Sequence, residues 1–85
     1  ANALRLVTVS RLNPMKGHKL AIAAVRTLVD EGIDITYDII GEGEYRSEIE
    51  RQISDARLDQ RVRLVGPIAN DAVTSRLIEY DAFIL

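Results

Sequence analysis

Hydrophobic residues along the chain follow two spacings that alternate with each other. Short apolar runs rich in Val, Ile, Leu and Thr predict β-strands at residues 4–10, 33–40, 62–65 and 82–85. Between them, apolar residues recur every three or four positions, which predicts helices at residues 17–31, at 44–57 and from Asn70 onward. Strands and helices that alternate over so short a chain pair in parallel through right-handed crossovers. The pattern therefore predicts an α/β fold.

The first two helices differ in how much of their surface is apolar. The helix at 17–31 has only a narrow polar stripe, so we expect neighbouring helices as well as the sheet to cover it. Its apolar positions are Leu20, Ala21, Ala24, Val25, Leu28 and Val29. The helix at 44–57 carries one thin apolar stripe among charges, with Glu48 placed to pair with Arg51 or Gln52. We expect this second helix to be mostly solvated.

The arrangement that fits these elements is a Rossmann-like half-domain. It has four parallel strands in the order 3-2-1-4, with three helices packed on both faces, and it forms a single partial domain over residues 1–85. In that order the first and fourth strands are neighbours, and the topological switch point lies between them. Ligands of such sheets bind at the carboxyl ends of the strands beside that point. The loop at 11–16, where Asn13-Pro14 disfavours a helix, is therefore the expected binding loop.

Composition and charge exclude several kinds of site. The 85 residues include no cysteine and one histidine, so disulfides, thiolate metal sites and a histidine-rich metal site are not expected, and we predict no metal. Eleven basic and thirteen acidic residues give a net charge of -2, which does not favour binding to nucleic acid. With no basic leader and no apolar run of about 18 residues, we expect a cytoplasmic protein.

Familiar nucleotide-binding motifs are missing where the fold would need them. A G-x-G-x-x-G loop should follow the first strand, but the only glycine pair, Gly41 and Gly43, follows the second, and Arg46 stands at the third glycine position. No P-loop sequence is present. The first strand ends at Ser10 without the acidic cluster of a receiver domain. These observations do not favour NAD binding, a P-loop phosphate site or phospho-acceptor chemistry.

The loop after the first strand offers two cations instead of glycines. Arg11 and Lys16 stand on either side of a short turn that leads into a helix N-terminus. Free N–H groups at a helix start favour anions, and a guanidinium and an ammonium would add charge-assisted hydrogen bonds to a diphosphate. The alternative is that both are ordinary solvated surface charges, and composition alone favours that interpretation.

Four short strings resemble the group 1 (family 4) glycosyltransferases. They occur in order at the ends of the predicted strands: VSRL at 9–12 with KGH at 16–18, IIGEG at 39–43, VRLVGPI at 62–68 and YDAFIL at 80–85. The resemblance extends from end to end of the chain and implies the GT-B fold and a retaining, nucleotide-sugar-dependent enzyme. The similar stretch is the first half of the C-terminal donor-binding domain of that family. The resemblance therefore implies a longer parent, which would lie in the cytoplasm or at the inner membrane surface.

The resemblance implies roles for particular residues. Arg11 and Lys16 match the basic pair that holds the donor diphosphate of a UDP-, GDP- or ADP-sugar, where they would stabilise charge on the departing nucleoside diphosphate. Gly66, Pro67 and Ile68 match the loop that lies against the nucleotide base and contacts it partly through backbone groups. A simple proline turn is the alternative for that loop.

The resemblance also implies a glycine turn near the cleft. Gly41 and Gly43 match it, and we expect their role to be conformational, since glycine allows positive φ and close approach. Family members often have glycine where this chain has Ser10.

No catalytic residue is expected in this chain. His18, the only histidine, has no carboxylate placed by sequence to orient it, and is interpreted as a polar residue at a helix start. Glu42 and Glu50 have the E-x7-E spacing known in the family, but the family's motif follows the strand at which this chain stops, so neither is expected to inherit its role. Tyr37 and Tyr80 are interpreted as core or boundary aromatics.

The expected function is that of one part of a larger enzyme. The parent would transfer a glycosyl group, such as a hexosyl group, from a nucleotide sugar to an acceptor, without a cofactor, whereas this truncated half of the donor domain would be inactive alone. We expect it to form homo-oligomers through an exposed strand edge or an apolar helix face. The alternative is a non-catalytic Rossmann-like or flavodoxin-like module for binding or self-assembly.

Overall fold

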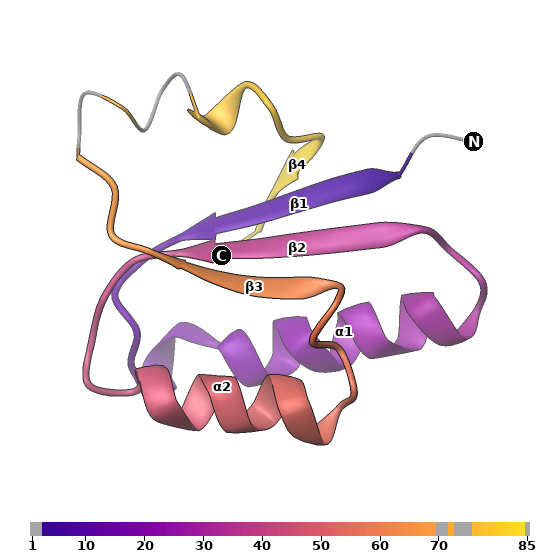
Figure 1. The fold of residues 1–85 in the computed structure, drawn as a ribbon, viewed down its shortest axis with the longest axis horizontal. Helices are drawn as coiled ribbons and strands as arrows, with labels where there is room; N and C mark the ends of the chain where they lie inside the picture. The colour runs from indigo at the N-terminus through magenta and orange to yellow at the C-terminus, as the bar shows by residue number, and fades with distance from the viewer. Residues whose placement is uncertain (1–2, 70–71, 73–75, 85) are drawn as a thin grey trace.

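A computed structural model describes residues 3–69, 72 and 76–84. They form one parallel sheet in the order β3-β2-β1-β4, so the predicted strand order is confirmed (Figure 1). The elements are β1 (Leu4–Val9), the 3-10 turn η1 (Pro14–Lys16), α1 (His18–Asp30), β2 (Ile35–Ile40), α2 (Arg46–Asp55), β3 (Val62–Gly66) and β4 (Ala82–Phe83).

The first strand lies inside the sheet, where the topology requires it. β1 pairs with β2 along its whole length, from Leu4 opposite Ile35 to Val9 opposite Ile40. On its other side β1 pairs with the short β4 at Leu6 and Val7. The loop after β1 therefore leaves the sheet between two neighbouring strands, beside the switch point.

The main core lies between the sheet and two helices. Figure 1 shows α1 and α2 on the same side of the sheet. Alternate residues of β2 point toward them, and Tyr37, the largest fully buried side chain, places its hydroxyl 2.6 Å from Oγ1 of Thr8. The buried core consists of Leu6, Leu12, Ala21, Ile22, Val25, Ile35, Tyr37, Ile39, Ile49, Ile53, Leu58 and Val62.

The predicted third helix lies only partly within the described residues. Ala72, Arg76 and Leu77 are helical, whereas the expected cap at Asn70 and the core position Val73 fall outside the described ranges. The hydroxyl of Tyr80 reaches Asp38, whose neighbours in β2 point toward α1 and α2. Because neighbouring residues of a strand point to opposite faces, this segment packs on the face away from those helices.

The expected covering of α1 is wrong on its outer side. Leu20 is 77% exposed and Ala24 is exposed as well, while Ile22, which the pattern did not select, is buried. The sheet and α2 cover one face of α1, and no other described element lies over the remaining apolar positions. None of the helices in the described residues is long and apolar enough to cross a membrane.

Candidate functional site

The loops that follow β1 and β2 are joined by backbone hydrogen bonds beyond the last strand residues. The N–H of Ser10 donates to the carbonyl of Ile40 at 3.0 Å, and the N–H of Leu12 donates to the carbonyl of Glu42 at 3.1 Å. The N–H of Tyr45 then donates to the carbonyl of Leu12 at 3.2 Å. The parallel pairing thus continues into the loops and holds their backbones together.

Both glycines of the 41–43 loop lie where a β-carbon would strike the opposing backbone. A Cβ on Gly41 would lie 1.8 Å from the carbonyl oxygen of Ser10, and one on Gly43 would lie 2.3 Å from that of Leu12. Gly41 also has a φ of +150°, whereas Gly43 does not have a positive φ. The close approach of the two loops is therefore the physical reason for the glycine pair.

The carboxyl end of β3 joins the same edge. The N–H of Gly41 donates to the carbonyl of Gly66 at 3.0 Å, and the β2–β3 register shifts just before Gly66 pairs with Ile40. Gly66 is buried with a φ of +91°, Pro67 is exposed, and Ile68 is half-buried. The residues expected to approach a nucleotide base thus lie beside the glycine turn.

Arg11 and Lys16 lie in the same connection between β1 and α1, and both are exposed. A 3-10 turn forms inside the predicted loop because Oδ1 of Asn13 accepts a hydrogen bond from the N–H of Met15 at 2.9 Å. Gly17, with a φ of 76°, turns the chain into α1 directly after Lys16. Within the described ranges neither cation forms an ion pair with a carboxylate. Their charges are therefore available to an anion at the start of α1.

His18 is buried, which its interpretation as a polar residue at a helix start did not anticipate. Its side chain is 2% exposed, and Nε2 lies 3.0 Å from Oγ of Ser10. Burial lowers the pKa of His18 and the charge of Lys16 lowers it further, while the backbone of Asn13 acts in the opposite direction. The sequence signal was present, since His18 begins the helical spacing that continues through Ala21, Ile22 and Val25.

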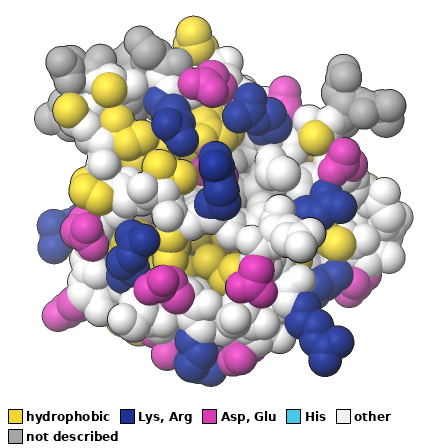
Figure 2. All heavy atoms as spheres, in the orientation of Figure 1, with side chains coloured by type: hydrophobic (Ala, Val, Ile, Leu, Met, Phe, Trp, Pro, Cys, Tyr) yellow, Lys and Arg dark blue, Asp and Glu magenta, His cyan; other side chains and the backbone are white. Residues whose placement is uncertain are grey.

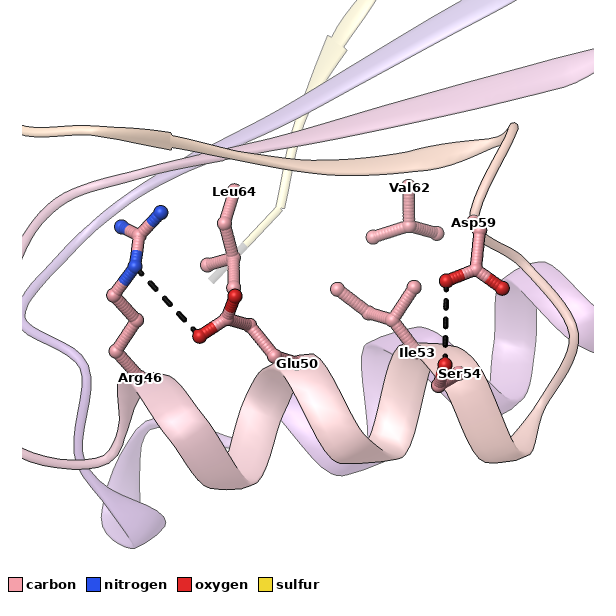
Figure 3. A pocket seen from close by; sticks show the side chains of 7 residues that line it. All are labelled: Arg46, Glu50, Ile53, Ser54, Asp59, Val62 and Leu64. Carbon is pink, nitrogen blue, oxygen red and sulfur yellow. Dashed lines mark hydrogen bonds and ion pairs between the residues drawn. The ribbon is translucent and has the colours of Figure 1, made fainter.

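The two glutamates with the E-x7-E spacing lie on different elements. Glu42 is exposed on the loop after β2. Glu50, on α2, lies 3.9 Å from Arg46 over a groove of about 330 Å³ between α2 and β3 (Figure 3). Ile53 and Leu64 also line that groove. Nothing in this geometry supports a shared role for the two carboxylates.

A polar cluster on the opposite face of the sheet was not predicted. Asp38 is 4% exposed, and Arg63 donates to its two oxygens at 3.0 and 2.7 Å, while the hydroxyl of Tyr80 donates at 2.6 Å. Burial raises the pKa of Asp38, but the hydrogen bonds from Arg63 and Tyr80 outweigh it, so that the pKa lies below its ordinary value. The available sequence signal was a carboxylate inside an apolar strand, whereas its pairing with Arg63 comes from the register of β2 and β3 in the structure.

Charges of both signs are mixed over the molecule. Figure 2 shows basic and acidic side chains interspersed with small hydrophobic patches on the face drawn. On α2, Glu48 pairs with Arg51 and accepts a hydrogen bond from Gln52 at 3.4 Å, which confirms the predicted surface pairing. Among the residues that the structure describes, no group of three or more His, Cys, Asp or Glu side chains could hold a metal ion.

Comparison with known proteins identifies the family. The sequence profile of the family described as "Glycosyl transferases group 1" matches residues 2–85. The chain belongs to the group 1 glycosyl transferases. It is 37% identical over 82 residues to the amylovoran biosynthesis glycosyltransferase AmsK of Erwinia amylovora, covering 96% of this chain and 20% of that protein. It is 30% identical over 77 residues to the 2-deoxystreptamine glucosyltransferase of Streptomyces kanamyceticus, covering 91% of this chain and 20% of that protein. This group 1 chain thus spans about a fifth of the length of these relatives.

Solved structures show the same fold. The group 1 chain superposes on Anabaena HepE in complex with UDP with a TM-score of 0.82 and 24% identity, covering 96% of this chain and 22% of HepE. For the C-terminal domain of the group 1 protein LpcC from Francisella tularensis the TM-score is 0.80 at 23% identity, covering 94% of this chain and 44% of that domain. The predicted family and Rossmann-like fold are confirmed.

Proposed function

We propose that this chain binds the nucleoside-diphosphate part of a sugar donor for a retaining glycosyltransferase. The carrying observation is that Arg11 and Lys16 lie exposed in the loop after the central strand, directly before α1. Family membership supports the same function. The donor would be a UDP-, GDP- or ADP-sugar, and its diphosphate would lie at the carboxyl edge of the sheet.

The two cations would act mainly on the charge of the diphosphate. A guanidinium forms bidentate hydrogen bonds with phosphate oxygens, and an ammonium adds a point charge. The free N–H groups in the first turn of α1 add a further favourable interaction with an anion. As the bond between sugar and diphosphate breaks, negative charge grows on the diphosphate, so Arg11 and Lys16 would stabilise the transition state more than the ground state.

The loop at 66–68 is proposed to lie against the nucleotide base. A β-carbon added at Gly66 would meet no atom within 4 Å, so there is open space beside that backbone. HepE and the pneumococcal O-GlcNAc transferase GtfA, which share this fold, were solved in complex with UDP. Their fold therefore accommodates this class of ligand.

We propose that residues 1–85 supply one part of the donor domain and that transfer needs the rest of a longer parent. Residues that bind the sugar, and a domain that binds the acceptor, would lie outside this chain, in agreement with its span of about a fifth of its relatives. The chain alone is then expected to transfer no sugar. Incubation with UDP-, GDP- and ADP-sugars and candidate acceptors tests this, and turnover by the chain alone would contradict it.

Calorimetric titration with UDP, GDP and ADP tests the binding function. Arg11→Ala and Lys16→Ala should each weaken binding of the preferred nucleotide by about tenfold or more, because each removes a charge-assisted hydrogen bond. Lys19→Ala is the matched control, since Lys19 is an exposed cation in the first turn of α1, outside the loop. Binding that survives both substitutions, or that Lys19→Ala weakens equally, would contradict the proposed site. Absence of binding to the unmodified chain would contradict the function.

We also propose that the chain self-associates. β4 lies at the edge of the described sheet, and its Phe83 is 55% exposed. Leu20 on α1 is 77% exposed. An open strand edge and exposed large apolar side chains are surfaces on which a second copy can pair and bury apolar area.

A further inference from the structure

His18 lies beneath the loop that carries the two cations. It is 2% exposed although it is the first residue of α1, and it contacts Ser10 at the start of the loop. The backbone of Asn13 raises the pKa of His18 and the charge of Lys16 lowers it, so the ring interacts with both residues. The buried ring thus contacts Ser10 and interacts electrostatically with Asn13 and Lys16.

A chain of hydrogen bonds connects the imidazole to the backbone of Arg11. Nε2 of His18 lies 3.0 Å from Oγ of Ser10, and that oxygen lies 3.1 Å from the carbonyl oxygen of Arg11. A hydroxyl has one hydrogen, so when Ser10 donates to the Arg11 carbonyl it accepts from the N–H at Nε2. In this tautomer the neutral imidazole supports the backbone of Arg11, the residue proposed to bind the diphosphate.

The other ring nitrogen explains why the ring should stay neutral. Nδ1 is buried and forms no hydrogen bond of normal geometry with the described residues, although the backbone of Asn13 favours a proton on the ring. A proton there would add charge to a site whose surrounding loop and first helical turn carry the cations Arg11, Lys16 and Lys19. The facing loop between β2 and α2 contributes two carboxylates, those of the exposed Glu42 and Glu44.

We propose that His18 is a positioning residue for the diphosphate loop, and that its neutral ring, acting through Ser10, fixes the backbone that carries Arg11 and Lys16. The inference rests on the proposed function, because the groups that it positions are the proposed diphosphate ligands. Protonation of His18 at Nδ1 keeps the N–H at Nε2 but places a buried cation beside Lys16, and this repulsion weakens the support of the loop.

Nuclear magnetic resonance tests the positioning without any ligand. His18 is the only histidine, so its ring signals are unambiguous. In a titration from about pH 8 to about pH 4.5, the ring should titrate below the ordinary histidine value of about 6.5. The amide signals of residues 10–13 and 15–17 should shift with the same midpoint, and these shifts should be absent in His18→Gln. Loop signals that do not follow the ring would overturn the inference.

UDP affinity, measured near pH 7.5, tests the consequence for binding. His18→Ala should weaken binding by about tenfold, because it removes a buried hydrogen-bond donor and leaves a gap under the loop. His18→Gln can place an N–H near the position of Nε2 and should remain within about threefold of the unmodified chain. Ile53→Val, a core change in α2, is the control for stability alone and should leave affinity unchanged.

The outcomes separate the two proposals. Unchanged affinity in His18→Ala, or an equal loss in His18→Gln and His18→Ala, overturns the positioning role while the diphosphate site stands. If UDP, GDP and ADP all fail to bind the unmodified chain, the proposed function fails, and the loop titration alone decides whether His18 positions the loop.

Discussion

At the scale of single residues, the carboxyl edge of the sheet requires glycine at two positions. The loop at 41–43 lies so close to the loop at 10–12 that neither Gly41 nor Gly43 has room for a β-carbon. Overlap with backbone atoms cannot be relieved by a rotamer change, so any larger residue must push the two loops apart.

Gly43→Ala should therefore destabilise the protein by more than about 2 kcal/mol, since separating the loops breaks the hydrogen bonds of Leu12 to Glu42 and Tyr45. Urea unfolding measures the change. Gly32→Ala is the control, because Gly32 has a φ of +86° but open space around it. Gly32→Ala should lower the free energy of unfolding by only about 1 kcal/mol, because a β-carbon strains the left-handed backbone there but meets no other atom. A smaller loss in Gly43→Ala than in Gly32→Ala would contradict the steric account.

Asp38 should make stability depend on pH in the acid range. Its pKa is depressed in the folded protein, so its contribution is complete above the unfolded value of about 4 and is lost as pH falls through the lower folded value. Asp38→Asn should lower the free energy of unfolding at neutral pH by about 1–2 kcal/mol and flatten its decline below about pH 4. The expected loss of stability is modest because the side chain of Arg63 is 64% exposed and water screens its interaction with Asp38.

Asp34→Asn is the matched control for the acid-stability experiment. Asp34 also pairs with an arginine, Arg61, but its side chain is 59% exposed. Its removal should change the free energy of unfolding at neutral pH by less than about 0.5 kcal/mol. Chemical unfolding at several pH values gives both curves, and equal pH dependence in Asp38→Asn and the unmodified chain would show that Asp38 is not the group responsible.

At the scale of elements, the hydrophobic pattern predicted strands and helices well but could not say what covers them. β1, β2, β3 and α1 begin and end within two residues of their predicted bounds. Periodicity locates an apolar stripe, but Leu20 and Ala24 extend it onto a side of α1 that no described element covers. Likewise Leu58, in the turn after α2, is fully buried without belonging to any periodic segment. Tertiary packing decides such positions.

The end of α2 illustrates local geometry that the sequence did not reveal. Leu58 donates to the carbonyl of Ile53 at 3.0 Å and Arg57 donates to that of Ser54 at 3.0 Å, the pair of bonds that defines a Schellman motif. Arg57 therefore has a φ of 57°, a conformation that favours glycine.

Arg57→Gly should stabilise the protein by about 1 kcal/mol, because it relieves the left-handed strain at the end of α2. Arg57→Ala is the comparison, since alanine also removes the charge but keeps the β-carbon. It should leave the free energy of unfolding nearly unchanged. If both substitutions had the same effect in urea unfolding, the conformational explanation would be wrong.

At the scale of the whole molecule, topology did most to locate the candidate site. Alternating strands and helices predict a parallel sheet, and the Rossmann order 3-2-1-4, which the structure confirms, places the loop after β1 beside the switch point. Side-chain partners did not follow from topology. Asp38 and Arg63 are far apart in the sequence, and the burial of His18 depends on how the loop folds over α1. Long-range pairing of this kind requires coordinates.

Self-association is a property of the whole molecule and should appear as a concentration-dependent dimer in sedimentation equilibrium. Phe83→Lys should abolish the dimer if the edge at β4 forms the contact, because it places a charge in the interface. Leu20→Lys makes the same change on α1 and distinguishes the helix face from the strand edge. A strict monomer at high concentration would contradict the proposal.

The central claim is that the loop between β1 and α1 holds a nucleoside diphosphate. A crystal structure of the chain with UDP, GDP or ADP, whichever binds, tests it most directly. The account predicts diphosphate oxygens within hydrogen-bonding distance of both Arg11 and Lys16, with the base beside residues 66–68. A nucleotide bound elsewhere, or a diphosphate at this edge that neither cation contacts, would contradict it.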